Sequence, residues 1–162
     1  MNIIVRKYMD EDLPFMIEIW NDIVIEGNAF PQMDVIDIKT AREIFPSQSF
    51  TGVAVEGDEI VGLYILHPNN IGRCGHIGNS SYGVKKGCRG KNIGEKLVVH
   101  SLAKAKELGF KIMQFNAVVK NNKAAICLYK KLGFSRLGTI PQGFLLKDGS
   151  YEDIILYYKN IK

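Results

Sequence analysis

The chain has 162 residues, the size of one ordinary domain, and we expect a single domain over residues 1–162. Apolar residues make up 46% and charged residues 23% of the chain, which excludes an intrinsically disordered protein. The net charge of +4 suits an anionic small-molecule partner and is too weak, without a clustered basic patch, to indicate nucleic acid.

The sequence also argues against a membrane partner and a secreted protein. Its apolar runs fall short of the roughly 18 residues that a membrane-spanning helix requires. The N-terminus lacks the apolar core of a signal peptide. Three cysteines, Cys74, Cys88 and Cys127, are an odd number in a chain that can form its own core. We therefore expect free thiols and a cytoplasmic protein.

The first half of the chain predicts two helices and three strands. Residues 3–5 form a short apolar strand, and acidic residues 10–12 with Pro14 predict a helix over 13–25. A weaker helix follows over 37–45 and ends before Pro46. Two apolar strands, 53–56 and 60–66, flank a turn at residues 57–58 and predict a hairpin.

The second half alternates strands and helices. We expect a strand near 76–85, a helix after Gly94 that stops at Gly109, a strand over 111–119, a helix from Asn121 to Leu132, and strands over 135–140 and 151–158. The order β-α-α-β-β-β-α-β-α-β-β predicts an α/β fold, a mixed sheet with helices on both faces.

A glycine-rich connection joins the strand near 76–85 to the next helix, and it reads Arg89-Gly90-Lys91-Asn92-Ile93-Gly94. Small residues at a helix N-terminus let backbone N–H groups point at an anion, and two cations add charge. The loop therefore predicts a diphosphate cradle, although a surface turn with two solvated cations could have the same sequence. It is neither a Walker A loop nor a G-x-G-x-x-G fingerprint.

A second motif follows some thirty residues on and consists of Asn122, Ala125, Leu128, Tyr129, Lys131, Gly133 and Phe134. With the loop at 89–94, this motif resembles those of the GNAT superfamily of acyl-CoA-dependent N-acetyltransferases. The family loop, Gln/Arg-x-x-Gly-x-Gly/Ala, has its first glycine replaced here by Asn92. Asparagine tolerates a left-handed backbone better than most residues, so the turn can survive.

The resemblance implies a GNAT-like, largely antiparallel sheet in which parallel strands 76–85 and 111–119 splay apart around acetyl-CoA. A backbone N–H of Tyr82 or Gly83 would face the thioester oxygen, and Val84 would hold the pantetheine arm. The implied cofactor-binding residues are Tyr82, Gly83, Val84, Arg89, Gly90, Lys91, Asn92, Ile93, Gly94, Glu95, Asn122 and Tyr129. No metal is implied.

The implied reaction is direct attack of a neutral amine on the acetyl thioester, with Tyr129 as the acid that protonates the leaving thiolate. Asn116 and Asn122 complete the catalytic set that the resemblance implies. No glutamate stands on strand 76–85, where many relatives carry a base, and His76 is the titratable residue nearby. We expect ordered water, or an amine already partly neutral, to take the base's place.

Residues 67–82, 114–119 and 138–144 further resemble fungal members of the superfamily that acetylate proline analogues such as azetidine-2-carboxylate. This likeness implies acceptor binding by Asn79, Tyr82 and Asn116, with the Tyr82 hydroxyl altering the choice of acceptor. Asn79 and Tyr82 are three residues apart, so their side chains would point to opposite faces of a regular strand. We therefore predict a β-bulge between Asn79 and Val84 that turns both toward one site.

Several alternatives stay open. The chain could be a non-catalytic acyl-CoA-binding module, or its acceptor could be a polyamine or a peptide amine. Cys74 and His76 could form a nucleophilic pair on one strand face, although a free cysteine is commonly a small buried hydrophobe. Phe144 could cover the acceptor pocket or contribute to a homodimer.

Overall fold

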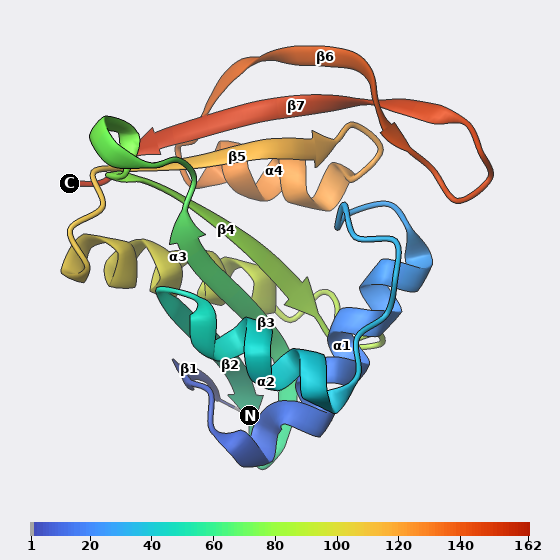
Figure 1. Ribbon diagram of the computed structural model, residues 1–162, viewed down its shortest axis with the longest axis vertical. Coiled ribbons are helices and arrows are strands. Elements are labelled where there is room, and N and C mark those ends of the chain that lie inside the picture. Colours follow the sequence, from blue (N-terminus) through green and yellow to red (C-terminus); the bar gives the residue numbers. More distant parts are fainter. Residues whose placement is uncertain (1) are drawn as a thin grey trace.

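The computed structural model of the chain describes residues 2–162. Its strands form one seven-stranded sheet in the order β1-β2-β3-β4-β5-β7-β6 (Figure 1). The elements are β1 (Ile3–Lys7), η1 (Asp10–Asp12), α1 (Leu13–Glu26), α2 (Ile38–Ser47), β2 (Phe50–Glu56), β3 (Glu59–Pro68), η2 (Gly72–Cys74), β4 (Ile77–Val84), α3 (Ile93–Glu107), β5 (Ile112–Val119), α4 (Lys123–Lys131), β6 (Ser135–Leu145) and β7 (Tyr151–Asn160). The order of strands and α-helices predicted from the sequence is confirmed.

The sheet is antiparallel except where β4 meets β5. These two strands pair in parallel at Ile77 with Ile112 and at Gly78 with Met113, and then they separate. Figure 1 shows the two ribbons diverging toward their C-terminal ends. The mixed sheet with a splayed parallel pair is therefore confirmed.

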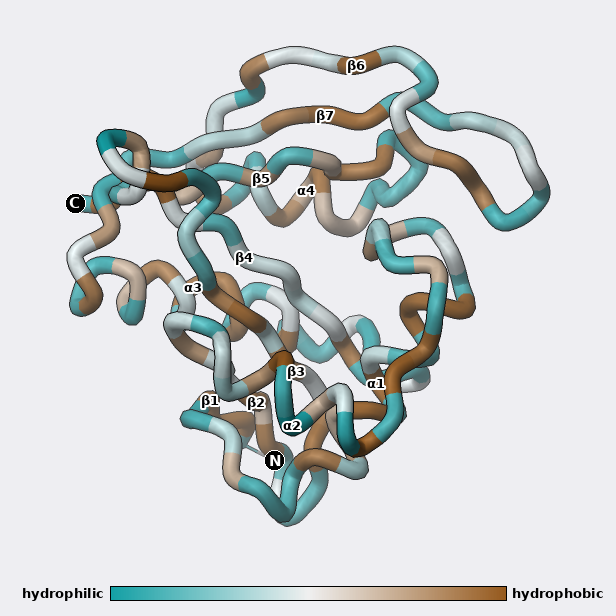
Figure 2. Tube along the Cα trace, viewed as in Figure 1, coloured by the Kyte–Doolittle hydropathy of each residue, from teal (hydrophilic) through white to brown (hydrophobic). Residues whose placement is uncertain are grey.

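Helices cover both faces of the sheet. One apolar cluster joins α1 and α2 to the odd-numbered residues Val53, Leu63 and Ile65, and a second joins α3 and Tyr129 of α4 to the opposite face. Figure 2 shows long hydrophobic stretches along α1 and β3, whereas the middle of the β4 trace is pale or hydrophilic. Polar residues on a central strand point to a role other than packing.

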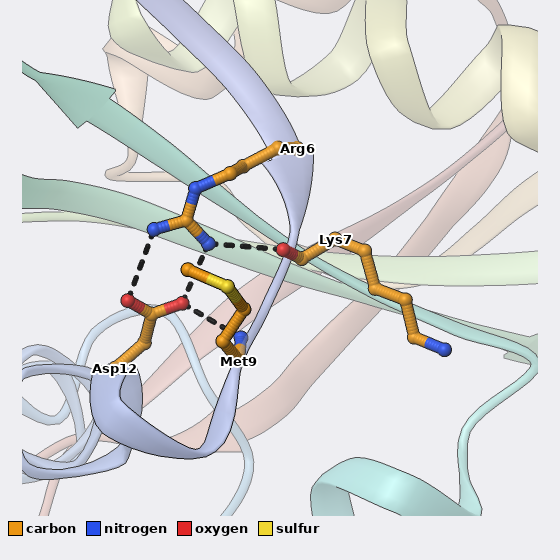
Figure 3. A network of polar contacts seen from close by, with 4 residues as sticks. All are labelled: Arg6, Lys7, Met9 and Asp12. Atoms are coloured by element: carbon orange, nitrogen blue, oxygen red, sulfur yellow. Dashed lines mark hydrogen bonds and ion pairs between the residues drawn. The ribbon is translucent and has the colours of Figure 1, made fainter.

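An ion pair joins the first strand to the start of α1 (Figure 3). The two terminal guanidinium nitrogens of Arg6 donate to the Asp12 carboxylate, at 2.7 and 3.1 Å, and the backbone N–H of Met9 donates to the same carboxylate at 2.7 Å. Asp12 is buried, which alone would raise its pKa, but these hydrogen bonds and the charge of Arg6 prevail and lower it. The pair fixes the angle at which α1 leaves β1.

Two predicted boundaries were wrong. Helix α2 continues past Phe45 and holds Pro46 in its last turn, where the missing proline N–H costs a single helical bond at a helix end. Strand β6 continues through Pro141 to Leu145 by way of an irregularity opposite β7. Phe144 lies buried there against Val119 and Ile154. Within residues 2–162, the helices lack the length and apolar character to cross a membrane.

Candidate active site

A cavity of about 210 Å³ lies where β4 and β5 diverge. Four segments line it: residues 29–31 of the connection between α1 and α2, residues 79–82 of β4, residues 115–119 of β5, and Asn122, Ala125 and Tyr129 at α4. The predicted residues Asn79, Tyr82, Asn116, Asn122 and Tyr129 are thus brought together. Among the described residues that line this cavity, none is Asp, Glu, Lys, Arg or His.

The bulge predicted in β4 was wrong. Strand β4 keeps one register against β3 from Gly78 to Val84. Gly83 faces Ile23 of α1, and the Tyr82 side chain reaches α3 on the opposite face. Asn79 and Tyr82 still line one cavity because the fork opens through the sheet, so both faces of β4 border it.

The fork leaves one backbone edge of β4 unpaired by β5. The N–H of Lys85 donates to the carbonyl of Val61 on β3, and the carbonyl of Ile77 accepts from Asn69 on the same side. Because backbone groups alternate along a regular strand, the N–H groups of Tyr82 and Val84 face the other side, toward the fork. Of the two donors considered from the sequence, Tyr82 therefore has the suitable direction and Gly83 faces β3.

The bulge lies in β5 instead. Phe115 pairs with Tyr157 and Val118 with Ile155, so that Asn116 and Ala117 both oppose Leu156. A bulge of this kind re-aims side chains and increases the local twist. Phe115 and Val118 are three residues apart and would point to opposite faces of a regular strand, but the bulge places both in the same apolar cluster. The bulge also leaves Asn116 exposed at the cavity.

Tyr129 lies at the inner wall of the cavity, packed among aromatic rings. Its ring centroid is 4.5 Å from that of Phe115 and 5.5 Å from that of Phe134. Burial raises its pKa, and the neighbouring phenols of Tyr82 and Tyr157 raise it further. Tyr129 therefore keeps its proton at neutral pH, which a general acid requires.

The Tyr82 hydroxyl bonds to α3, at a residue that does not line the cavity. Ser101 of α3 donates its hydroxyl proton to the carbonyl of Val98, so the Tyr82 hydroxyl donates to the Ser101 oxygen at 2.7 Å. Burial raises the pKa of Tyr82 to about 12, although hydrogen bonds with Ser101 and Ser80 oppose the rise. The tyrosine thus presents its ring to the cavity and anchors its hydroxyl on α3.

Asn122 caps α4. Its side-chain oxygen accepts the backbone N–H of Ala125 at 3.3 Å, which satisfies one of the free N–H groups at the helix start. The capping bond fixes the amide so that its nitrogen remains to serve as a donor in the cavity.

The glycine-rich loop has the geometry of an anion cradle. Asn92 adopts the left-handed conformation (φ 60°, ψ 23°) immediately before α3, as expected from the sequence. The first intrahelical bond runs from the Lys96 N–H to the Asn92 carbonyl. The N–H groups of residues 93–95 therefore precede the helical ladder and point outward from its positive end.

The cations of this loop contact carboxylates of the same chain. Arg89 pairs with Glu26 at the end of α1 at 3.0 Å, and Lys91 pairs with Glu56 at the end of β2 at 3.0 Å. Glu95 in the first turn of α3 pairs with Lys131 at 2.6 Å. These are exposed pairs, so a bound anion can compete for the cations at small cost.

Sequence reasoning missed three parts of the site. The cavity wall at Ala29, Phe30 and Pro31 lies in a connection without a periodic pattern, and Phe30 is held there by Trp20, with ring centroids 4.7 Å apart. Asn69 and Gln114 hydrogen-bond to the cavity asparagines. Both lie in the segments 67–82 and 114–119 that resemble fungal members of the superfamily, but their side-chain roles were not predicted, since Asn69 bonds to residues of β4 and β5 and Gln114 bonds within β5.

The residues considered for a nucleophilic pair lie elsewhere. Cys74 is exposed in η2, so it does not share a strand face with His76. Within residues 2–162, no three His, Cys, Asp or Glu side chains group in a way that could hold a metal ion.

Comparison with known proteins assigns this arrangement to a family. Residues 13–134 match the model of the acetyltransferase (GNAT) family, and the chain belongs to that family. N-acetyltransferase aca1 of Schizosaccharomyces pombe is 32% identical over 125 residues, which are 76% of this chain and 60% of aca1. The chain thus matches less than two thirds of that relative's length.

Solved structures share the whole fold. A GCN5-related N-acetyltransferase from Kribbella flavida has a TM-score of 0.89 and 29% identity, covering 98% of this chain and 97% of its own. A phosphinothricin acetyltransferase from Sinorhizobium meliloti, solved in complex with acetyl-CoA, has a TM-score of 0.91 and 20% identity, covering 99% of this chain and 89% of its own. At that identity the second likeness concerns the fold.

Proposed function

We propose that the protein transfers the acetyl group of acetyl-CoA to the amine of a small molecule, an amino acid or a proline analogue, in a ternary complex. The observation that carries this proposal is the cavity in the fork, where a neutral amide lining meets the buried phenol of Tyr129. The cradle at residues 89–94 and the edge of β4 lead toward that cavity.

In the proposed complex, acetyl-CoA lies along β4. The pyrophosphate would accept hydrogen bonds from the N–H groups at the start of α3, with charge from Arg89 and Lys91. The pantetheine arm would bond to the open backbone edge at Val84. The N–H of Tyr82 would face the thioester oxygen and stabilise the negative charge that develops there.

In the chemical step, the amine nitrogen attacks the thioester carbonyl carbon, a C–N bond forms, and the C–S bond breaks. The departing thiolate takes the proton of the Tyr129 hydroxyl, and solvent returns a proton to the phenolate. Asn116 and the free N–H of Asn122 would orient the reacting groups. The acceptor ammonium loses one proton to water before attack, and its nitrogen loses a second proton to water as the C–N bond forms, because the described cavity lining offers no carboxylate or imidazole.

The lining also favours one class of acceptor. A polyamine brings several ammonium groups into the site, and buried cations need carboxylate partners. Asn79 and Asn116 offer neutral amide donors and acceptors, which suit the carboxylate and amine of an amino acid. The likeness to aca1, an N-acetyltransferase, agrees with acetyl transfer to an amine nitrogen as a proposal for this chain.

A panel of amines tests the function. Acetyl-CoA would be incubated with the purified protein and with amino acids, azetidine-2-carboxylate, polyamines or peptides, and thiol release would be measured alongside product mass. We expect turnover with small amino or imino acids. Turnover with polyamines or peptides alone would overturn the acceptor assignment. Calorimetric binding of coenzyme A without turnover of any amine would instead identify a non-catalytic acyl-CoA-binding module.

A further inference from the structure

Three asparagines from three segments meet at the acceptor end of the fork. Asn69 follows the end of β3, Asn79 lies on β4, and Asn116 lies on β5. The Asn79 amide nitrogen donates to the side-chain oxygen of Asn69 at 3.2 Å, and the Asn116 amide nitrogen donates to the same oxygen at 2.6 Å. The cavity itself is lined by Asn79 and Asn116.

The side-chain oxygen of Asn69 bridges β4 and β5 just beyond the last residues that pair between these two strands. The ladder between β4 and β5 ends at Gly78 and Met113, so strand pairing does not set the distance between Asn79 and Asn116. Asn69 is itself fixed, because its backbone N–H donates to the carbonyl of Ile77 at 2.7 Å. One side chain therefore ties the two diverging strands together.

The same bonds determine which atoms the cavity receives. A carboxamide has one oxygen acceptor and two N–H donors, and their orientation is assigned from the bonding pattern. Gln114 donates to the Asn116 oxygen at 3.0 Å, so Asn116 retains one free N–H. Asn79 retains its oxygen and one N–H.

We propose that Asn69 is a positioning residue that orients Asn79 and Asn116 toward the acceptor. The proposal rests on the proposed function, in which those two residues contact the acceptor. The cradle begins at Arg89, ten residues after Asn79, and the five residues from Asn79 to the end of β4 at Val84 alone span about 17 Å of extended strand. Loss of Asn69 should therefore impair use of the acceptor and spare binding of acetyl-CoA.

Asn69→Leu removes the shared oxygen and keeps a similar volume. We expect kcat/KM for the acceptor to fall about 10- to 100-fold, since small misplacements of reacting groups have effects of this size. The KM for acetyl-CoA should stay unchanged. Asn69→Asp keeps an acceptor oxygen and should lie closer to wild type than Asn69→Leu does. Asn70→Leu is the matched control, because Asn70 is exposed and its side chain bonds to the adjacent Ile71 N–H.

A spectroscopic measurement separates this proposal from the proposed function. The side-chain NH₂ signals of Asn79 and Asn116 in a ¹H–¹⁵N correlation spectrum should move in Asn69→Leu and not in Asn70→Leu, whether or not any amine is acetylated. Should Asn69→Leu fail to fold, Asn69→Ala removes the same oxygen. Unmoved signals, or an equal loss of acetyl-CoA binding, would overturn the proposal. An inactive wild type with moved signals would overturn the proposed function alone.

Discussion

The rings of Tyr129 and Phe115 lie against each other with their centroids 4.5 Å apart, so α4 is packed on β5 through the same side chain that we assign as the acid. Tyr129→Phe keeps this packing and removes the hydroxyl. We expect kcat to fall about 10²- to 10⁴-fold, while the thermal unfolding midpoint changes little. Steady-state kinetics and calorimetry measure the two effects.

Tyr157→Phe supplies the control for Tyr129. It removes another largely buried phenol of the same aromatic cluster, 5.9 Å from Tyr129 between centroids, and should leave kcat unchanged. A Tyr129→Phe enzyme that turns over at the wild-type rate would eliminate the acid role.

The ion pair between Arg89 and Glu26 predicts competition with the cofactor. Glu26→Gln frees Arg89 for the pyrophosphate and should tighten binding of coenzyme A by up to about fivefold, the range of an exposed pair. Arg89→Gln should weaken binding. Calorimetry at low and high salt measures both, with Glu107→Gln as a control at the far end of α3. Weaker binding by Glu26→Gln would contradict the competition.

The uncharged lining predicts that the acceptor controls the pH dependence. With no carboxylate or imidazole among the described lining residues, the fraction of neutral amine should limit kcat/KM. Rates should rise with pH up to the pKa of the amine itself. Two active acceptors whose amine pKa values differ by about one unit should give profiles displaced by the same amount. Coincident profiles would indicate a protein base such as His76.

The Arg6–Asp12 pair predicts loss of stability in acid. The pKa of Asp12 is lower in the folded than in the unfolded chain, so its contribution is present above about pH 4 and is lost as pH falls toward the folded-state pKa. Asp12→Asn should lower the free energy of unfolding by about 2–4 kcal/mol at pH 7, because it leaves Arg6 without its buried partner.

Urea unfolding at pH 7 and pH 3 measures this effect. The difference between wild type and Asp12→Asn should shrink at the lower pH. Asp10→Asn is the control, because Asp10 pairs with Arg42 on the surface at 3.8 Å. An equal difference at both pH values would contradict the assignment.

Local sequence signals predicted most of the fold. The turn at Gly57 and the helix stop at Gly109 both have positive φ, as their hairpin and C-terminal positions require. The motif loop was also predictable, since Asn92 occupies the left-handed position that a glycine would otherwise take. In each case the conformation depends on residues within a few positions of one another.

The remainder depends on contacts between segments, which one sequence does not display. The alternation of side chains along β4 suggested a bulge near Tyr82. The site is formed instead by the separation of β4 from β5, and the bulge lies on β5 at Asn116. Asn69 looks like any loop asparagine until its oxygen is seen between two strands. The sequence motif predicted that Tyr82 lines the cavity. Its hydrogen bond to Ser101 could not be predicted, because that bond depends on how α3 packs against β4.

The divergence of β4 from β5 has a consequence for exchange of backbone protons with solvent. Tyr82 and Val84 lie in the middle of the sheet order, yet their amide protons face a gap and resemble those of an outermost strand. Deuterium should replace them sooner than it replaces the amide protons of Ser81 and Gly83, which point to β3. A thioester cofactor lying in the gap would slow that replacement, so these two amides would report its arrival directly.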